Sequence, residues 1–280
     1  MCKEAGAWLH ALPNKMKAFQ LSDKEFRTSL LFRLFMEQPI PAGLRCNCRS
    51  HPTIDKRGHH LLTGCGHGGC RIRAHDNQVA EVNRCLNYLN IMTRKEQRHL
   101  FKEFDPNDNH IPDITLINPP ASPMCAVTPL LFDISISSPI DGLNRGGDAY
   151  ANMSSTAAKQ PCRAANERAK AKENKYRPLC TPQAGRPQRF SFLAFIYETT
   201  GRIHPKSLKF IKLCCDTASI HKKIDSDSIY TYVLKRLSVC FQKSMASTVS
   251  ERIFALTTPS TTYNQDHSFD IQYVNSEQPF

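Results

Sequence analysis

The sequence lacks any long apolar stretch of the kind that exports a protein or anchors it in a membrane. Its first residues, MCKEAGAWLHALPNK, do not have the apolar core of a secretory signal. No segment reaches the ~18 consecutive apolar residues that a membrane-spanning helix requires. We therefore expect an intracellular protein, and we interpret its 12 cysteines as thiols or metal ligands rather than as a disulfide framework. Internal repeats are also absent from the sequence.

The composition nevertheless supports a packed core. Hydrophobic residues make up 40% of the 280 residues and aromatic residues 9%, which excludes a chain that is disordered by composition. Lysine and arginine number 37 against 25 aspartates and glutamates, which gives a formal net charge of +12. Such a surface attracts polyanions, so nucleic acid is the first partner to consider and an acidic membrane surface is the lesser alternative.

Composition and periodicity divide the chain into four segments. They are an N-terminal helical segment over 1–44, a Cys/His-rich loop over 45–70, an α/β domain over 71–256 and a polar tail over 257–280 that we expect to be disordered. In the first segment Ser22 and Glu25 form a predicted capping box at the start of a helix, which ends at Pro39 and Pro41.

Several further helices are indicated by the positions of apolar residues and prolines. A stripe at spacings of 3, 4 and 3 predicts a helix over 73–92, with the apolar positions Val79, Val82, Leu86 and Leu89. Residues 148–177 are predicted to be helical in two pieces, because Pro161 interrupts them. Two more helices are expected within 205–256.

Three short runs have the alternation of β-strands. The first two, IPDITLI (111–117) and LLFDISI (130–136), each contain one aspartate, Asp113 and Asp133. The connection between them shows no helical period, so we expect an antiparallel hairpin with both carboxylates on one face, a few ångströms apart. The alternative is that both face solvent on half-exposed strands. The third run, RFSFLAFIYETTG, ends in Glu198 and stops at Gly201.

The 45–70 loop crowds cysteine and histidine together. Three sulfurs and an imidazole, which zinc prefers as a tetrahedral set, lie within twenty residues, at Cys46, Cys48, His60 and Cys65. Further candidate ligands are His51, His59, His67 and Cys70. We predict a structural zinc site here; the alternative is a set of unliganded thiols.

The aspartate pair suggests a second metal. Magnesium binds through one or two carboxylates and water, and hydrolysis of a phosphodiester uses such an ion together with a nearby cation. Arg168, Lys172 and Lys175 share one basic face of the helix that contains ERAKAKENKY. That face either contributes a cation to the predicted magnesium site or is an ordinary solvated surface.

The order of these motifs resembles a known family. The segments ALPNKMKAFQLSDKEFRTSLLFRLF, CNC followed by RGHHLLTGC, RIRAHD, IPDITL, LFDISISSP, KENKY and YETTG occur from about residue 8 to about residue 213. They are similar to the C-terminal region of non-LTR retrotransposon polyproteins, which carries a zinc knuckle and a restriction-like endonuclease of the PD-(D/E)XK class. No Tyr-x-Asp-Asp motif of a reverse transcriptase is present, so we expect a part or a remnant of such a polyprotein.

The resemblance implies a restriction-endonuclease-like mixed sheet flanked by helices, and a nuclear enzyme that nicks DNA so that reverse transcription can begin. It implies Asp113 and Asp133 as Mg²⁺ ligands and Lys175, with Tyr176 beside it, as the catalytic lysine. Asp76 is an additional acidic candidate, and Glu198 matches a glutamate of unassigned role. We expect Arg168 and Lys172 to bind the DNA backbone, with the element RNA as a second partner. The alternative function is a non-catalytic nucleic-acid-binding module on a decayed nuclease scaffold.

Overall fold

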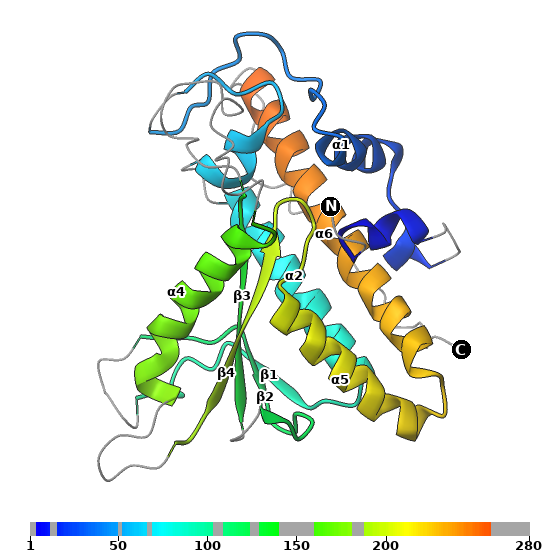
Figure 1. The fold of residues 1–280 in the computed structure, drawn as a ribbon. Helices are drawn as coiled ribbons and strands as arrows, with labels where there is room; N and C mark the ends of the chain where they lie inside the picture. Colours follow the sequence, from blue (N-terminus) through cyan, green and yellow to red (C-terminus); the bar gives the residue numbers. More distant parts are fainter. Residues whose placement is uncertain are drawn as a thin grey trace.

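The computed structural model describes residues 4–11, 16–49, 52–65, 69–102, 109–123, 129–139, 160–180 and 188–258. Helical elements come first along these ranges, three strands follow from residue 93, and α4 precedes the last strand, β4 (Figure 1). In chain order the elements are η1 (Glu4–His10), η2 (Lys17–Phe19), α1 (Asp23–Arg33), η3 (His60–Gly64), α2 (Gly69–Tyr88), β1 (Thr93–Lys95), β2 (Ile114–Leu116), β3 (Leu130–Ser137), α4 (Arg163–Cys180), β4 (Ser191–Glu198), α5 (Pro205–Lys222) and α6 (Ser226–Thr257).

A mixed sheet of four strands lies at the centre of the described chain, in the order β1-β2-β3-β4. β1 and β2 are antiparallel, as are β2 and β3, whereas β3 and β4 are parallel. The predicted mixed sheet flanked by helices is thus confirmed. The strand β1 was not predicted, because its sequence Thr-Arg-Lys has no apolar alternation and it is held by backbone pairing to β2.

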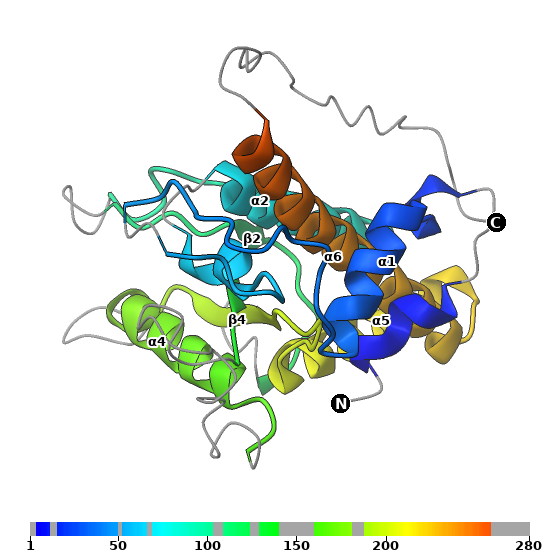
Figure 2. The ribbon, with the colours of Figure 1, turned by 90° about the horizontal axis from the view of Figure 1, so that it is seen from above.

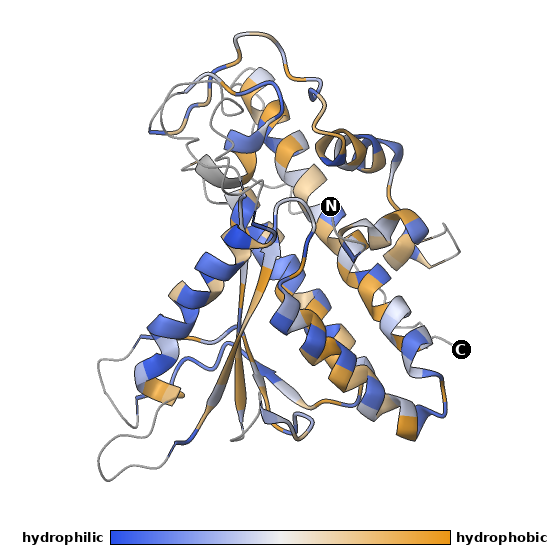
Figure 3. Ribbon diagram, in the orientation of Figure 1, coloured by the Kyte–Doolittle hydropathy of each residue, from blue (hydrophilic) through white to orange (hydrophobic). Residues whose placement is uncertain are grey.

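The two faces of the sheet carry different helices. α4 packs on one face, against β3 and β4, and α2 and α5 pack on the other (Figures 1 and 2). α6 packs against α2 and α5 on their side away from the sheet, and it also contacts α1. The strands β3 and β4 are mainly hydrophobic, whereas α4 is mainly hydrophilic (Figure 3). α4 therefore meets the sheet along a narrow line and exposes most of its surface.

Strand alternation assigns side chains to these two faces as predicted. The main core, shared with α2, α5 and α6, takes one alternate set from β2 and β3: Ile114, Leu116, Leu130, Phe132 and Ile134. The other set of β3 begins with Leu131, which packs under α4 in a separate small cluster with Tyr176. Asp133 and Ser135 follow on this second face.

Local sequence signals explain where the first helices begin and end. Ser22 and Glu25 form the predicted capping box at the start of α1. α1 ends at Arg33, earlier than predicted, and Phe35 nearby has a left-handed backbone (φ 55°) that cannot continue a helix. The predicted apolar stripe is buried: Val79, Val82 and Leu86 of α2, and Leu89 directly after it, all lie in the main core.

Some predictions concern residues that the structure does not describe. Residues 148–159 of the expected 148–177 helix lie outside the described residues, and α4 begins at Arg163, two residues after Pro161. The expected tail lies outside them from residue 259 onward, and α6 runs to Thr257. Among the described helices, none combines the length and apolar character needed to cross a bilayer.

Candidate metal centres and the cleft between them

The Cys/His cluster is assembled from a hairpin-like turn and a single π-type turn. Arg45 and Thr53 form an antiparallel bridge that brings the first two cysteines back toward the chain that follows. Asp55 then orders the approach to η3, because its carboxylate accepts hydrogen bonds from the backbone N–H groups of Arg57, His59 and His60. These hydrogen bonds to the backbone place His60 close to the cysteines.

The four predicted ligands, Cys46, Cys48, His60 and Cys65, converge and are all buried. Their ligand atoms lie within 4.8 Å of one another. Cys46 Sγ lies 3.5 Å from Cys65 Sγ, and Cys48 Sγ lies 3.6 Å from His60 Nε2. Ligands about 2.0–2.3 Å from one zinc ion are expected roughly 3.5–3.8 Å apart in a tetrahedron. The geometry and the donor set therefore fit a metal ion such as zinc.

The other candidate ligands are placed elsewhere or are not described. His59 is buried and packs its ring against Phe32, with centroids 5.8 Å apart. Cys70 lies in α2, where its Sγ is 3.5 Å from a carboxylate oxygen of Glu251. His51 and His67 fall outside the described residues. Burial raises the pKa of the Cys46 thiol to about 11, so deprotonation in the absence of a cation is unfavourable.

The two aspartates are brought together by the register of β2 and β3. Ile114 pairs with Phe132, so one further step of the antiparallel register sets Asp113 opposite Asp133. Asp113 accepts a hydrogen bond from the backbone N–H of Ile134 at 2.5 Å. Burial raises the pKa of Asp133, and the nearby charge of Asp113 raises it further, whereas the cation of Lys172 lowers it. Asp133 is buried rather than solvated, which argues against the solvent-facing alternative.

The line of contact between β3 and α4 decides which cation reaches Asp133. Two residues of strand rise about 6.6 Å and four residues of helix rise about 6 Å, so alternate strand residues can match successive helical turns. The matched pairs, in order along β3, are Leu131 with Tyr176, Asp133 with Lys172, and Ser135 with Arg168. The lysine amine lies 2.6 Å from Asp133 Oδ1, and the Arg168 Nε donates to the Ser135 hydroxyl at 2.8 Å.

This pairing differs from the roles expected for two lysines. Lys172, expected to bind the DNA backbone, is largely buried and forms an ion pair with Asp133. Lys175, expected at the catalytic centre, is exposed, and its amine lies over the ring of Tyr176 at 5.3 Å. The physical reason is that Tyr176 fills the contact with β3 at that turn, and Lys175 is displaced from it by about 100° around the helix.

His75 is a residue of the site that sequence reasoning missed. Its Nε2 lies 3.4 Å from Asp113 Oδ2 and 3.2 Å from the carbonyl oxygen of Ile134, and its Nδ1 lies 3.1 Å from Asp76 Oδ1. The hydrogen bond with Asp113 raises the pKa of His75 to about 9. Asp76 itself is exposed and joins the site through this imidazole. The neighbouring aspartate in RIRAHD was the available signal, but its spacing could not show which side chain faces the sheet.

Tyr176 and Glu198 position α4. The buried Tyr176 stacks on Phe192, with ring centroids 4.4 Å apart, and its hydroxyl donates to the carbonyl of Ile111 at 3.1 Å. Glu198 is buried at the end of β4, where its Oε1 accepts a hydrogen bond from the backbone N–H of Ala165 in the first turn of α4. The first N–H groups of a helix have no acceptor within the helix, and the Glu198 oxygen supplies one. Glu198 thus anchors the helix that carries the site cations.

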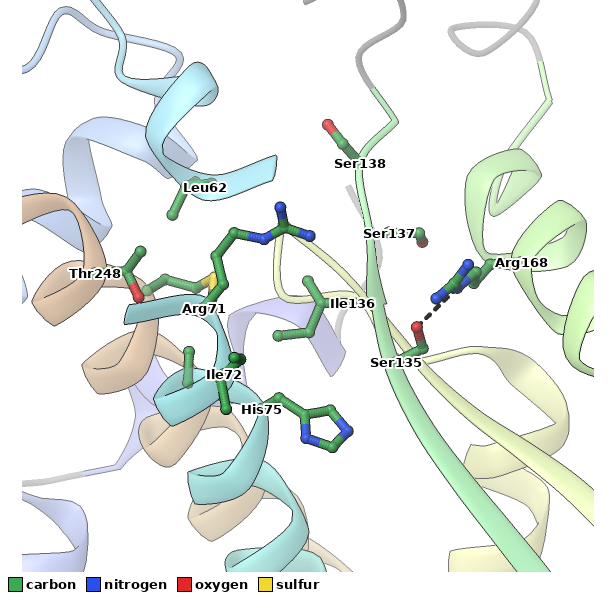
Figure 4. Close-up of a pocket in the computed structure, with 12 residues that line it drawn as sticks. Leu62, Arg71, Ile72, His75, Ser135, Ile136, Ser137, Ser138, Arg168 and Thr248 are labelled. Atoms are coloured by element: carbon green, nitrogen blue, oxygen red, sulfur yellow. Dashed lines mark hydrogen bonds between the residues drawn. The ribbon is translucent and has the colours of Figure 1, made fainter. Parts of the chain in front are cut away.

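A cleft of about 570 Å³ lies next to the aspartates, between the N-terminal turns of α2, the C-terminal end of β3 and α6. Arg71 and His75 point into it from α2, and Arg168 reaches the end of β3 from α4 (Figure 4). Ser137 and Ser138 add hydroxyl groups to its wall. No carboxylate is among the described residues that line the cleft, so its polar lining suits an anion.

Comparison of the chain with protein-family models and with curated proteins found no match to either.

Proposed function

We propose that this protein is a metal-dependent DNA endonuclease of the kind encoded by non-LTR retrotransposons, which nicks target DNA so that reverse transcription can begin. The observation that carries the proposal is the juxtaposition of Asp113 and Asp133 on paired strands with the amine of Lys172 at 2.6 Å from Asp133. Two neighbouring carboxylates, of which Asp133 is buried and Asp113 partly exposed, repel each other and favour a cation between them, and such coupled titratable groups are frequent at active sites.

The donor set is compatible with magnesium. Both candidate ligands are carboxylates, which Mg²⁺ prefers, and Asp113 retains partial solvent access. The contacts with His75 and Ile134 use Oδ2 of Asp113, and the contact with Lys172 uses Oδ1 of Asp133. A magnesium ion held by these groups supplies charge for a scissile phosphate and lowers the pKa of an attacking water.

The side chains of the chain itself would share the remaining work. Lys172 holds Asp133 in its rotamer and places a positive charge next to the carboxylates, where charge on a phosphate would develop. Arg71 and Arg168 line the cleft and suit contacts with the sugar-phosphate backbone, which fix register without reading sequence. The DNA backbone is therefore proposed to cross the end of β3, with the element RNA as a further candidate partner.

Nicking of supercoiled plasmid with Mg²⁺ tests this function. Asp113→Asn and Asp133→Asn should each abolish Mg²⁺-dependent nicking at equal DNA occupancy. Lys175→Ala is the matched control, because this lysine is exposed on the same helix, and it should nick at nearly the wild-type rate. Equal rates for wild type and Asp133→Asn would refute the assignment of the nuclease site.

A second function has its own support. Lys172 and His75 already place positive charge at Asp133 and Asp113 within the chain, so the pair has a structural explanation that needs no metal. The protein is then a nucleic-acid-binding module on a nuclease-like scaffold. Salt-dependent DNA binding without Mg²⁺-dependent nicking in the wild type would favour this alternative.

A further inference from the structure

Arg252 is a buried arginine of α6 that lies against the Cys/His cluster. It is 8% exposed, and its Nη2 lies 3.6 Å from the sulfur of Cys46, which is 206 residues away in the sequence. The same nitrogen lies 2.9 Å from the amide oxygen of Asn47. Its Nε is buried and has no hydrogen-bond partner among the described residues.

Among the described residues, the hydrogen-bond partners of this guanidinium include no carboxylate. A buried arginine is unfavourable unless an anion is close to it. The amide oxygen of Asn47 is neutral, and so is the sulfur of Cys46 while it remains a thiol. The contact with Cys46 balances this charge if the cysteine cluster itself becomes negative.

Metal binding would produce that negative charge. Zinc binds cysteine as thiolate and histidine as neutral imidazole. Three thiolates and one dication leave one net negative charge in a buried site, and one guanidinium cancels it. The single positive charge of Arg252, placed next to Cys46, therefore matches the single net negative charge of the metal-loaded cluster.

We propose that Arg252 is the charge-balancing partner of the Cys/His cluster and that it couples metal binding to the seating of α6. The inference rests on the proposal that this cluster holds zinc, and it is independent of the nuclease activity. Thr248, one turn before Arg252, lines the cleft and hydrogen-bonds the carbonyl of Cys70 in α2 at 3.4 Å. Metal binding would thus add a tie between the cluster and the part of α6 that lines the cleft.

Zinc affinity, measured by competition with a chromophoric chelator, tests the charge role. Arg252→Gln should weaken zinc binding about 10- to 100-fold, the range typical of lost outer-shell partners of metal ligands. Arg252→Lys should recover most of that loss, because the charge returns. Lys243→Gln is the control on the same helix: its amine donates to the backbone oxygen of Lys17 at 3.0 Å, away from the cluster, so zinc affinity should stay close to wild type.

Two further measurements separate a charge effect from a folding defect. In the Co²⁺-loaded protein, Arg252→Gln should shift the thiolate-to-metal absorption band to longer wavelength, because the sulfur loses a donor that stabilises its electrons. Hydrogen exchange over 245–257 should slow when zinc is added to wild type and should respond less in Arg252→Gln.

The possible outcomes are distinct. Equal zinc affinity in wild type and Arg252→Gln, or an equal loss in Lys243→Gln, would overturn the inference alone. Failure of the wild type to bind zinc would overturn the metal site together with the inference. Neither result bears on nicking, which the Asp133→Asn comparison decides.

Discussion

Replacing Lys172 with methionine removes the cation from a buried carboxylate while keeping most of the side-chain volume. The side chain of Lys172 is 16% exposed and that of Asp133 is 6% exposed, with the amine 2.6 Å from the carboxylate. Without the lysine, the burial and the neighbouring Asp113 that raise the pKa of Asp133 are no longer opposed by this cation. The folded protein must then hold an unpaired charge or take up a proton.

Protonation limits the cost. Keeping a carboxyl with an ordinary pKa of about 3.9 protonated at pH 7 costs about 1.4 kcal/mol for each of about three pH units, or about 4 kcal/mol. At pH 5 the same limit is about 1.5 kcal/mol. Because the folded-state pKa is raised, the penalty is present above the unfolded-state pKa and disappears as the pH falls. The variant should therefore lose up to about 4 kcal/mol of stability at pH 7 and much less at pH 5.

Urea unfolding in metal-free buffer at the two pH values measures this difference. Lys175→Met is the control on the same helix, and because this lysine is exposed it should change stability by less than about 0.5 kcal/mol. Lys172→Met combined with Asp133→Asn should recover most of the loss, because no charge is left unpaired. The reasoning is refuted if Lys172→Met and Lys175→Met have the same stability at pH 7.

Three further results are expected. Chelation should lower the melting temperature of the wild type. The melting temperature of Cys65→Ser should not change with chelator, whereas that of Cys180→Ser, a cysteine outside the cluster, should still fall. The logarithm of DNA affinity should fall linearly with the logarithm of salt concentration, and Arg71→Gln or Arg168→Gln should each reduce the slope by about 1; binding that is independent of salt would contradict the proposed interface. Burial raises the pKa of Glu198, so Glu198→Gln should be more stable than wild type at pH 7 and equal to it below about pH 4, where both side chains are neutral. Unfolding curves that differ equally at both pH values would contradict this explanation.

The Cys/His cluster could be predicted from the sequence because its chemistry is local. The four ligands lie within twenty residues of one another, and few arrangements of a short loop satisfy them all. The same is true of the capping box at Ser22, the apolar stripe of α2 and the alternation of β3, since each depends on residues a few positions apart. These signals also sufficed to predict helices around a sheet.

Contacts between distant segments were decided only by the tertiary structure. The sequence placed Lys172 and Lys175 on one basic face, but the match between the rise of β3 and the turns of α4 sets Lys172 on Asp133 and leaves Lys175 in solvent. His75 reaches Asp113 because the N-terminal turns of α2 lie beside β3, and Arg252 reaches Cys46 across 206 residues because α6 packs beside the cluster. Periodicity specifies which face of an element is buried. Which side chains meet across that face depends on the relative translation of two packed elements, and no local pattern encodes it.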